Sequence, residues 1–172
     1  AIAAQILNIY PNASPNFIKC FLISGAMGGG TTDNPSIDSV WGLANSYYSI
    51  YKHLDEIIDC YDENIVGELL SGYPTTIKYE IQIPQNSTML VVTLVYDDPP
   101  AMVISDKSLI NDLDLYLRDP DGNILYYRDD NVNNVEKYII LNPKNGKWEI
   151  YVEAVSLPGI SPFEYQEYAI SI

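Results

Sequence analysis

The hydrophobic pattern of residues 111–123 (NDLDLYLRDPDGN) is that of a strand followed by a turn. Its three leucines occupy every second position, and polar or aromatic residues stand between them. Because successive side chains of a strand point to opposite faces, this spacing predicts a strand with one apolar face. The DPDG sequence at its end favours a turn, and the run at 124–128 predicts the returning strand of a hairpin.

Further short apolar runs, separated by turn sequences rich in Pro, Asn, Asp and Gly, fill the remainder of the second part of the chain. About eight short strands with such turns are typical of an antiparallel β-sandwich, and we expect a mainly β protein with the jelly-roll arrangement. The predicted strands are 65–70, 77–83, 88–96, 113–118, 124–128, 137–141, 147–155 and 163–172.

The first part of the chain is helical in character. Ser14 is a good N-cap and Pro15 a good first residue for the second of the expected helices. The change from helical to strand pattern places a domain boundary near 55–64, which divides the chain into 1–55 and 56–172. The predicted helices are 1–10, 15–24 and 42–54.

Composition limits the classes of partner. There are 9 Lys and Arg against 23 Asp and Glu, so the net charge is 9 − 23 = −14. Such a surface is unsuited to nucleic acid, whose phosphates require basic residues. No stretch is long and apolar enough to span a membrane. The content of 47% hydrophobic residues is sufficient for a core, and the low charged fraction of 19% suits an extracellular protein.

No residue of the chain is a good candidate for catalysis. His53 is the only histidine, and it lacks a glycine-flanked nucleophile or an evident aspartate partner, so we interpret it as a surface residue. The glycines at 28–30 resemble a phosphate loop only superficially, because no strand precedes them. Their expected role is to end a helix.

Carboxylates gather around the hairpin at 111–123. Asp112 and Asp114 share the polar face of its first strand, and Asp129 and Asp130 begin a second oxygen-rich loop. Calcium takes about six to eight oxygen ligands, so neighbouring strands could bring these carboxylates together as a calcium site. The spacing is not that of an EF-hand loop. A hydrogen-bonded network within the turn is the alternative interpretation of the polar residues there.

The two cysteines, Cys20 and Cys60, also leave two interpretations open. Secretion would favour a disulfide that joins the second helix to the start of the sandwich. Cys20 lies in an apolar run, however, where a buried free thiol packs equally well.

Several stretches together resemble the C-terminal region of subtilisin-like serine proteases that carry a β-sandwich after the catalytic domain. AIAAQILNIYPNASPNFIKCFLISGA is similar to the segment that follows the catalytic serine in that family. VWGLANSYYSIY resembles the Gly-Trp-Gly-x-x-Asn sequence of the family, although Val40 replaces the first glycine. The stretches that resemble its jelly-roll domain are 93–100, 111–123, 130–136 and 145–154.

This resemblance implies a C-terminal part of an extracellular serine endopeptidase. The helices at 1–55 would complete its α/β catalytic domain, and the sandwich at 56–172 would brace that domain. In the family the nucleophilic serine lies shortly before the segment at which this chain begins, and the other catalytic residues lie further upstream. No catalytic residue is therefore expected within these 172 residues.

Two other classes of function compete with this interpretation. One is a secreted structural or assembly subunit that uses the same sandwich without peptidase activity. The other is a module that binds a glycan or a protein through Tyr47, Tyr48, Tyr126 and Tyr127. Paired tyrosines at strand positions are also common as half-buried packing of a sheet surface.

The helices predicted at 1–10 and 15–24 are unusually apolar. A surface helix normally has one apolar stripe and a broad polar face, whereas these two have few polar residues. We therefore expect both helices to pack against protein outside this sequence, either the N-terminal catalytic half of the enzyme or a neighbouring copy of the chain.

Overall fold

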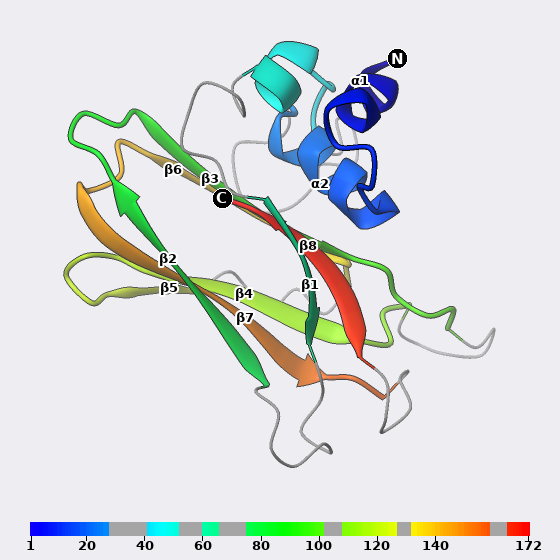
Figure 1. The fold of residues 1–172 in the computed structure, drawn as a ribbon. Coiled ribbons are helices and arrows are strands. Elements are labelled where there is room, and N and C mark those ends of the chain that lie inside the picture. Colours follow the sequence, from blue (N-terminus) through cyan, green and yellow to red (C-terminus); the bar gives the residue numbers. More distant parts are fainter. Residues whose placement is uncertain (28–40, 52–59, 66–74, 102–107, 127–131, 159–164) are drawn as a thin grey trace.

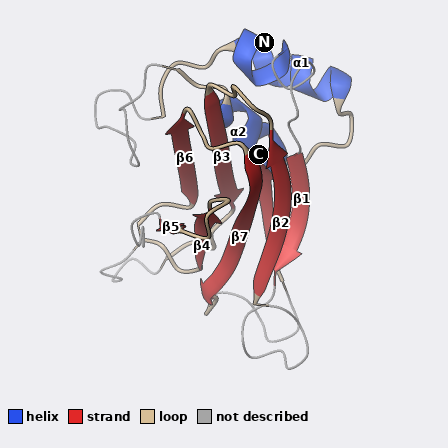
Figure 2. Cartoon of the chain, turned by 90° about the vertical axis from the view of Figure 1, so that its left-hand side faces the viewer, coloured by secondary structure: helices blue, strands red, loops and turns tan. Residues whose placement is uncertain are grey.

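The computed structural model describes residues 1–27, 41–51, 60–65, 75–101, 108–126, 132–158 and 165–172. Along these residues, two four-stranded antiparallel sheets face each other, and helices lie against the outer side of one of them (Figure 1). The second view shows the helices together at one side, away from β4 and β5 (Figure 2). The predicted mainly β, sandwich architecture is therefore confirmed.

The order of the strands is β1-β8-β3-β6 in one sheet and β2-β7-β4-β5 in the other. The pairs are nested, since β1 pairs with β8, β2 with β7, β3 with β6 and β4 with β5. This nesting is the jelly-roll arrangement. The strands are β1 (Cys60–Ile65), β2 (Thr76–Ile83), β3 (Met89–Tyr96), β4 (Asp112–Arg118), β5 (Ile124–Tyr126), β6 (Val135–Leu141), β7 (Gly146–Ser156) and β8 (Gln166–Ser171).

The main core lies between the two sheets and follows the alternation of the strands. In β4, Leu113, Leu115 and Leu117 are buried, while the residues between them are partly exposed. Trp148 and Ile150 of β7 contribute to the same core. Each fully buried leucine stabilises the fold by about 2–3 kcal/mol through removal of apolar surface from water.

The first two helices agree closely with their predictions. They are α1 (Ile2–Ile9) and α2 (Pro15–Ser24). The Ser14 hydroxyl accepts a hydrogen bond from the Phe17 amide at 3.0 Å, as expected of an N-cap residue. This bond satisfies one of the amides that has no partner within the first turn of the helix.

The third predicted helix begins later than expected. Its described part is a π-helical turn, η1 (Tyr47–Tyr51), and the residues after it lie outside the described ranges. The side-chain oxygen of Asn45 accepts hydrogen bonds from the Tyr47 and Tyr48 amides, at 3.0 and 3.3 Å. Before it, Leu43 pairs with Met27 as an isolated β-bridge, so the backbone there is extended rather than helical.

The first strand also differs from its prediction at 65–70. The structure places β1 at 60–65, antiparallel to β8, and residues 66–70 lie outside the described ranges. The sequence of β1, CYDENI, has little apolar alternation, so its pairing with β8 had no clear signal in the sequence.

Candidate functional site: the helix-bearing face of the sandwich

A second, smaller core joins α2 to the outer face of the β1-β8-β3-β6 sheet. Its members are buried apolar residues of both layers, and Phe17 and Phe21 of α2 stack with ring centroids 4.7 Å apart. From the sheet, the core includes Val95, Val135 and Ala169. The strands here are thus apolar on both faces, because Val95 points to the helix while its neighbours point into the sandwich.

This packing accounts for one side of the helix at 15–24, where Phe17, Phe21 and Ile23 are buried against the sandwich and its neighbours. Contact of this helix with protein outside the sequence stays a prediction. The expectation rested on the argument that the sandwich cannot cover both helices while it also fills its own core. The buried side chains of Val95, Val135 and Ala169 show that the sheet does supply a second apolar surface under α2.

A buried lysine lies at the end of this interface. Lys137 of β6 is only 5% exposed, and its Nζ donates hydrogen bonds to the carbonyl oxygens of Ile23 at 2.7 Å and Ala26 at 3.3 Å. Carbonyls at the C-terminal end of a helix lack partners within the helix and carry partial negative charge. Burial lowers the pKa of Lys137 to about 8, and the nearby thiol of Cys20 opposes that shift.

Two further polar contacts connect α2 with the sheet. The thiol of Cys20 donates to the carbonyl oxygen of Thr93 at 3.2 Å, and the hydroxyls of Ser24 and Ser171 lie 3.2 Å apart. Cys20 is a free, buried cysteine, as the second of our two interpretations predicted. The side chain of Cys60 lies outside the described part of the structure.

The end of α2 is also in close contact with η1. A methyl group in place of the Gly25 hydrogen would lie 2.2 Å from the hydroxyl oxygen of Ser49 and 2.5 Å from its amide nitrogen. Ser49 is fully buried. Only glycine therefore permits this approach of the two helical elements.

In contrast, α1 packs mainly on α2 and leaves an apolar face open. Ile6 is buried against the second core, whereas Leu7 and Ile9 are 40% and 37% exposed. This part of the expectation about the helices, that α1 packs on protein outside the sequence, stays a prediction.

The predicted calcium residues are only partly described. Asp112 and Asp114 lie, half-buried, on the outer face of β4, where Asp114 pairs with Glu153 of β7. Asp129 and Asp130 fall outside the described ranges. Among the residues that the structure does describe, no three metal-ligating side chains form a group that could hold an ion. Two carboxylates are fewer than calcium requires, so calcium stays a prediction.

The turn after β4 forms the hydrogen-bonded network that was the alternative. One Asp119 carboxylate oxygen accepts from the amides of Asp121 and Asn123 at 2.9 and 2.8 Å, and the other accepts from the Asn123 side chain at 2.8 Å. The bond from the Asn123 side chain is the main reason that the pKa of Asp119 is lowered. Lys144 forms ion pairs with Asp119 and Asp121.

On the outer surface of β4 and β7, two tyrosine rings that the sequence analysis did not select are stacked on each other. Tyr116 and Tyr151 stack with centroids 4.7 Å apart and an angle of 7°, and the Arg118 guanidinium lies 5.7 Å from the Tyr151 ring. The Tyr151 hydroxyl donates to Glu149 at 2.8 Å. The stacking covers one face of each ring, and Arg118 lies over Tyr151, so the pair packs on the sheet surface.

Of the four tyrosines predicted as possible glycan or protein contacts, the structure describes the side chains of two. Tyr47 and Tyr48 meet edge to face, with centroids 5.4 Å apart, and Tyr47 is 54% exposed. The side chains of Tyr126 and Tyr127 lie outside the described part of the structure, as do His53 and the glycines at 28–30.

Comparison with protein families finds one similarity in the sandwich. The family model of the bacterial pre-peptidase C-terminal domain matches residues 75–154. This part of the sandwich is therefore similar to that domain. The match begins just before β2 and ends within β7, so it includes the hairpin from which the sequence analysis began. Domains of this family are the C-terminal domains of bacterial peptidases, which agrees with a non-catalytic C-terminal part of such an enzyme.

Other comparisons add little. A solved structure of Bacillus licheniformis lipase BlEst2 in its propeptide form matches with 13% sequence identity and a TM-score of 0.42. The match covers 66% of this chain and 21% of that chain, so this chain spans about a fifth of the length of the lipase. At that TM-score the likeness supports no argument about function. No curated protein matches the chain. Within the described residues, no helix is long and apolar enough to cross a membrane.

Proposed function

We propose that this chain is the C-terminal part of an extracellular subtilisin-like serine endopeptidase, and that it stabilises the catalytic domain without taking part in catalysis. The observation that carries the proposal is the match of residues 75–154 to the pre-peptidase C-terminal domain. The resemblance of the helical part and of the jelly-roll motifs to subtilisin-like proteases supplies the narrower assignment. Secretion follows from the same assignment, since domains of this family occur in secreted bacterial peptidases.

In this proposal the helices form the interface that connects the catalytic domain to the sandwich. Residues 1–55 would belong to the catalytic domain and residues 56–172 to the sandwich. The buried contacts of Phe17, Phe21 and Lys137 then hold the last helices of the catalytic domain on the sandwich. Unfolding of the catalytic domain would have to separate α2 from the sheet, so the sandwich would raise the free energy of unfolding.

The exposed face of α1 supports the same proposal. Leu7 and Ile9 lie on a short helix of which one side is buried against α2. A catalytic domain that continues the helical layer would cover this face. Exposed in isolation, the face would add to the apolar surface of the chain.

A serine-reactive fluorophosphonate tests the proposal. The isolated chain should not react, because acyl transfer needs a nucleophile, a base and an oxyanion hole, none of which we assign to it. The complete protein encoded by the gene should form one adduct, on a serine outside these 172 residues. If the complete protein fails to react and lacks peptidase activity, the proposal is wrong and the chain is part of a structural or assembly subunit instead.

A further inference from the structure

The sheet that carries α2 extends beyond the helix. On its outer face, β8 ends beside β3 at the pair Thr93 and Ser171. Beyond that point β3 and β6 continue as a two-stranded ribbon with two more outward-facing pairs, Val91 with Ile139 and Met89 with Leu141. We call these four residues the apolar strip.

The strip is continuous with the surface that α2 covers. In the adjoining pair, Thr93 is fully buried and Lys137 nearly so. One pair further, Ile139 is 45% exposed, and at the end of the ribbon Met89 and Leu141 are 47% and 69% exposed. On the outer face of the sheet, the side chains are therefore buried at the pair Thr93 and Lys137, and they become exposed from the next outward-facing pair onward.

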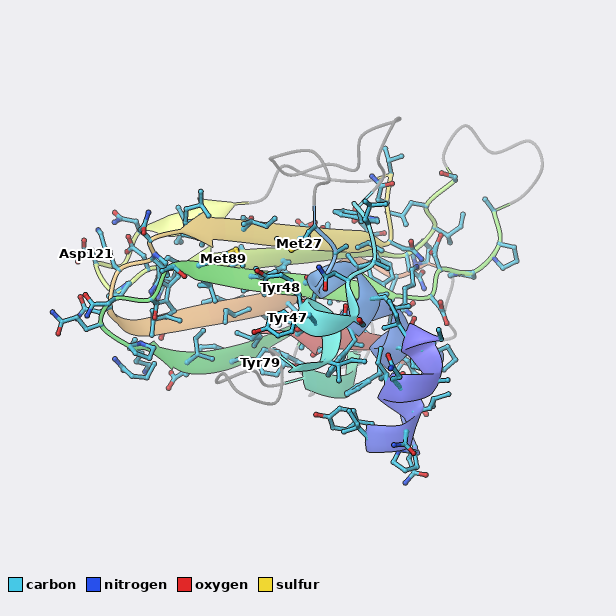
Figure 3. The ribbon with its side chains drawn as sticks, turned by 90° about the horizontal axis from the view of Figure 1, so that it is seen from above. Met27, Tyr47, Tyr48, Tyr79, Met89 and Asp121 are labelled. Carbon is cyan, nitrogen blue, oxygen red and sulfur yellow. The ribbon has the colours of Figure 1, made fainter. Side chains whose placement is uncertain are left out.

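Met27 lies at the boundary between the covered and open parts. The carbonyl oxygen of the preceding residue, Ala26, lies 3.3 Å from the Lys137 amine, and Met27 itself is 45% exposed. Figure 3 labels both Met27 and Met89 in a view from the helical side of the molecule. The helical layer thus ends beside the strip with another apolar side chain.

We propose that the apolar strip is a docking surface for the catalytic domain of the peptidase, next to the α2 interface. This inference rests on the proposed function, because that function supplies the partner. Continuity favours it: the same face of the same two strands already holds α2 through the second core. A partner that extends the helical layer of α2 along β3 and β6 meets the strip directly.

The chemistry of the strip favours an apolar partner and disfavours a second copy. None of its four outward-facing residues is ionisable, so a partner can bury them without desolvating a charge. Methionine at one end gives the surface an adaptable shape. A second copy of this chain would bring together two molecules of charge −14, which repel each other.

The test measures the accessibility of one residue of the strip in the isolated chain and in the complete protein. Ile139→Cys places a thiol in the strip, and Gln82→Cys places one at an exposed position of β2 on the opposite sheet as the control. Both positions tolerate a small polar side chain because they are exposed. Each variant is treated with iodoacetamide, and mass spectrometry of peptides follows labelling at that position alone.

The proposal predicts that Ile139→Cys reacts at least about tenfold more slowly in the complete protein than in the isolated chain, because the linked domain is present at high effective concentration. Gln82→Cys should react equally fast in both. Equal rates for Ile139→Cys would overturn the proposal. So would protection in the isolated chain, which identifies a second copy if the chain is a dimer by light scattering and the chain's own residues if it is a monomer.

The fluorophosphonate separates this proposal from the proposed function. If the complete protein reacts with the fluorophosphonate but Ile139→Cys stays fully accessible, the docking surface is wrong and the peptidase assignment stands. If the complete protein does not react with the probe and Ile139→Cys is protected, a different partner covers the strip, and both proposals are wrong.

Discussion

The buried side chain of Lys137 allows a quantitative prediction of how stability depends on pH. Replacing it with methionine keeps a long apolar side chain and removes both the charge and the hydrogen bonds to the Ile23 and Ala26 carbonyls. We expect Lys137→Met to change stability in a way that depends on pH. At neutral pH two effects oppose each other, because the variant loses two hydrogen bonds but no longer buries a charged amine.

The sign of the pH dependence follows from the lowered pKa. Burial brings the pKa of Lys137 from 10.5 to about 8 in the folded protein. Between these two values, the unfolded chain keeps a proton on this lysine that the folded protein has released. The contribution of Lys137 to the free energy of unfolding therefore rises as the pH increases from about 8 to 10.5. The neutral amine still donates to the same carbonyls.

The size of the effect follows from the difference of 10.5 − 8 = 2.5 pH units. At about 1.36 kcal/mol for each unit, wild type should gain on the order of 3 kcal/mol relative to Lys137→Met between pH 8 and 10.5. Urea unfolding of both proteins at intervals of pH measures this difference, and it cancels titrations that the two share. Lys147→Met, at an exposed position of β7, is the matched control and should show little change. A difference between wild type and Lys137→Met that stays constant across this range would refute the reasoning.

Three further predictions concern the helix interface and the acidic face. Gly25→Ala should destabilise the chain by about 1–3 kcal/mol in urea unfolding, because the new methyl group collides with Ser49; unchanged stability would mean that η1 does not pack there in solution. Cys20 should resist alkylation in the native chain and react in denaturant without any reductant, and a requirement for reductant would reveal a disulfide. If the predicted calcium site exists, a chelator should lower the melting temperature of wild type, and Asp114→Asn should abolish that response; a melting temperature insensitive to chelator would leave only the turn network.

The sequence predicted most strands well where apolar residues alternate. The pattern of β4 was sufficient because its leucines all face one core. The prediction of β6 missed its first two residues, Val135 and Glu136, since Glu136 is polar but buried. Glu136 accepts a hydrogen bond at 2.8 Å from the Leu115 amide of the opposite sheet. Such contacts between distant residues satisfy buried polar groups, and a local pattern cannot reveal them.

The helix-bearing face was the least predictable part. The sequence showed that α2 is too apolar for an exposed helix, but it could not show which surface covers it. That surface combines Val95, Val135 and Ala169 from three strands, far apart in the sequence. The strand pairings bring them together. The nearly continuous apolar run of β3, MLVVTLVY, is consistent with a strand buried on both faces, but it does not reveal what covers the outer face.

The most direct test of the central claim, that the sandwich stabilises a catalytic domain, is the thermal inactivation of the complete protein. Val95→Ala removes methyl groups from the sheet side of the α2 interface, where Val95 is fully buried. Val155→Ala, at a position of β7 that is 50% exposed, is the matched control. We predict that Val95→Ala shortens the half-life of peptidase activity at elevated temperature, leaves kcat/KM at 25 °C unchanged, and that the control changes neither. A half-life for Val95→Ala equal to that of wild type would contradict the account.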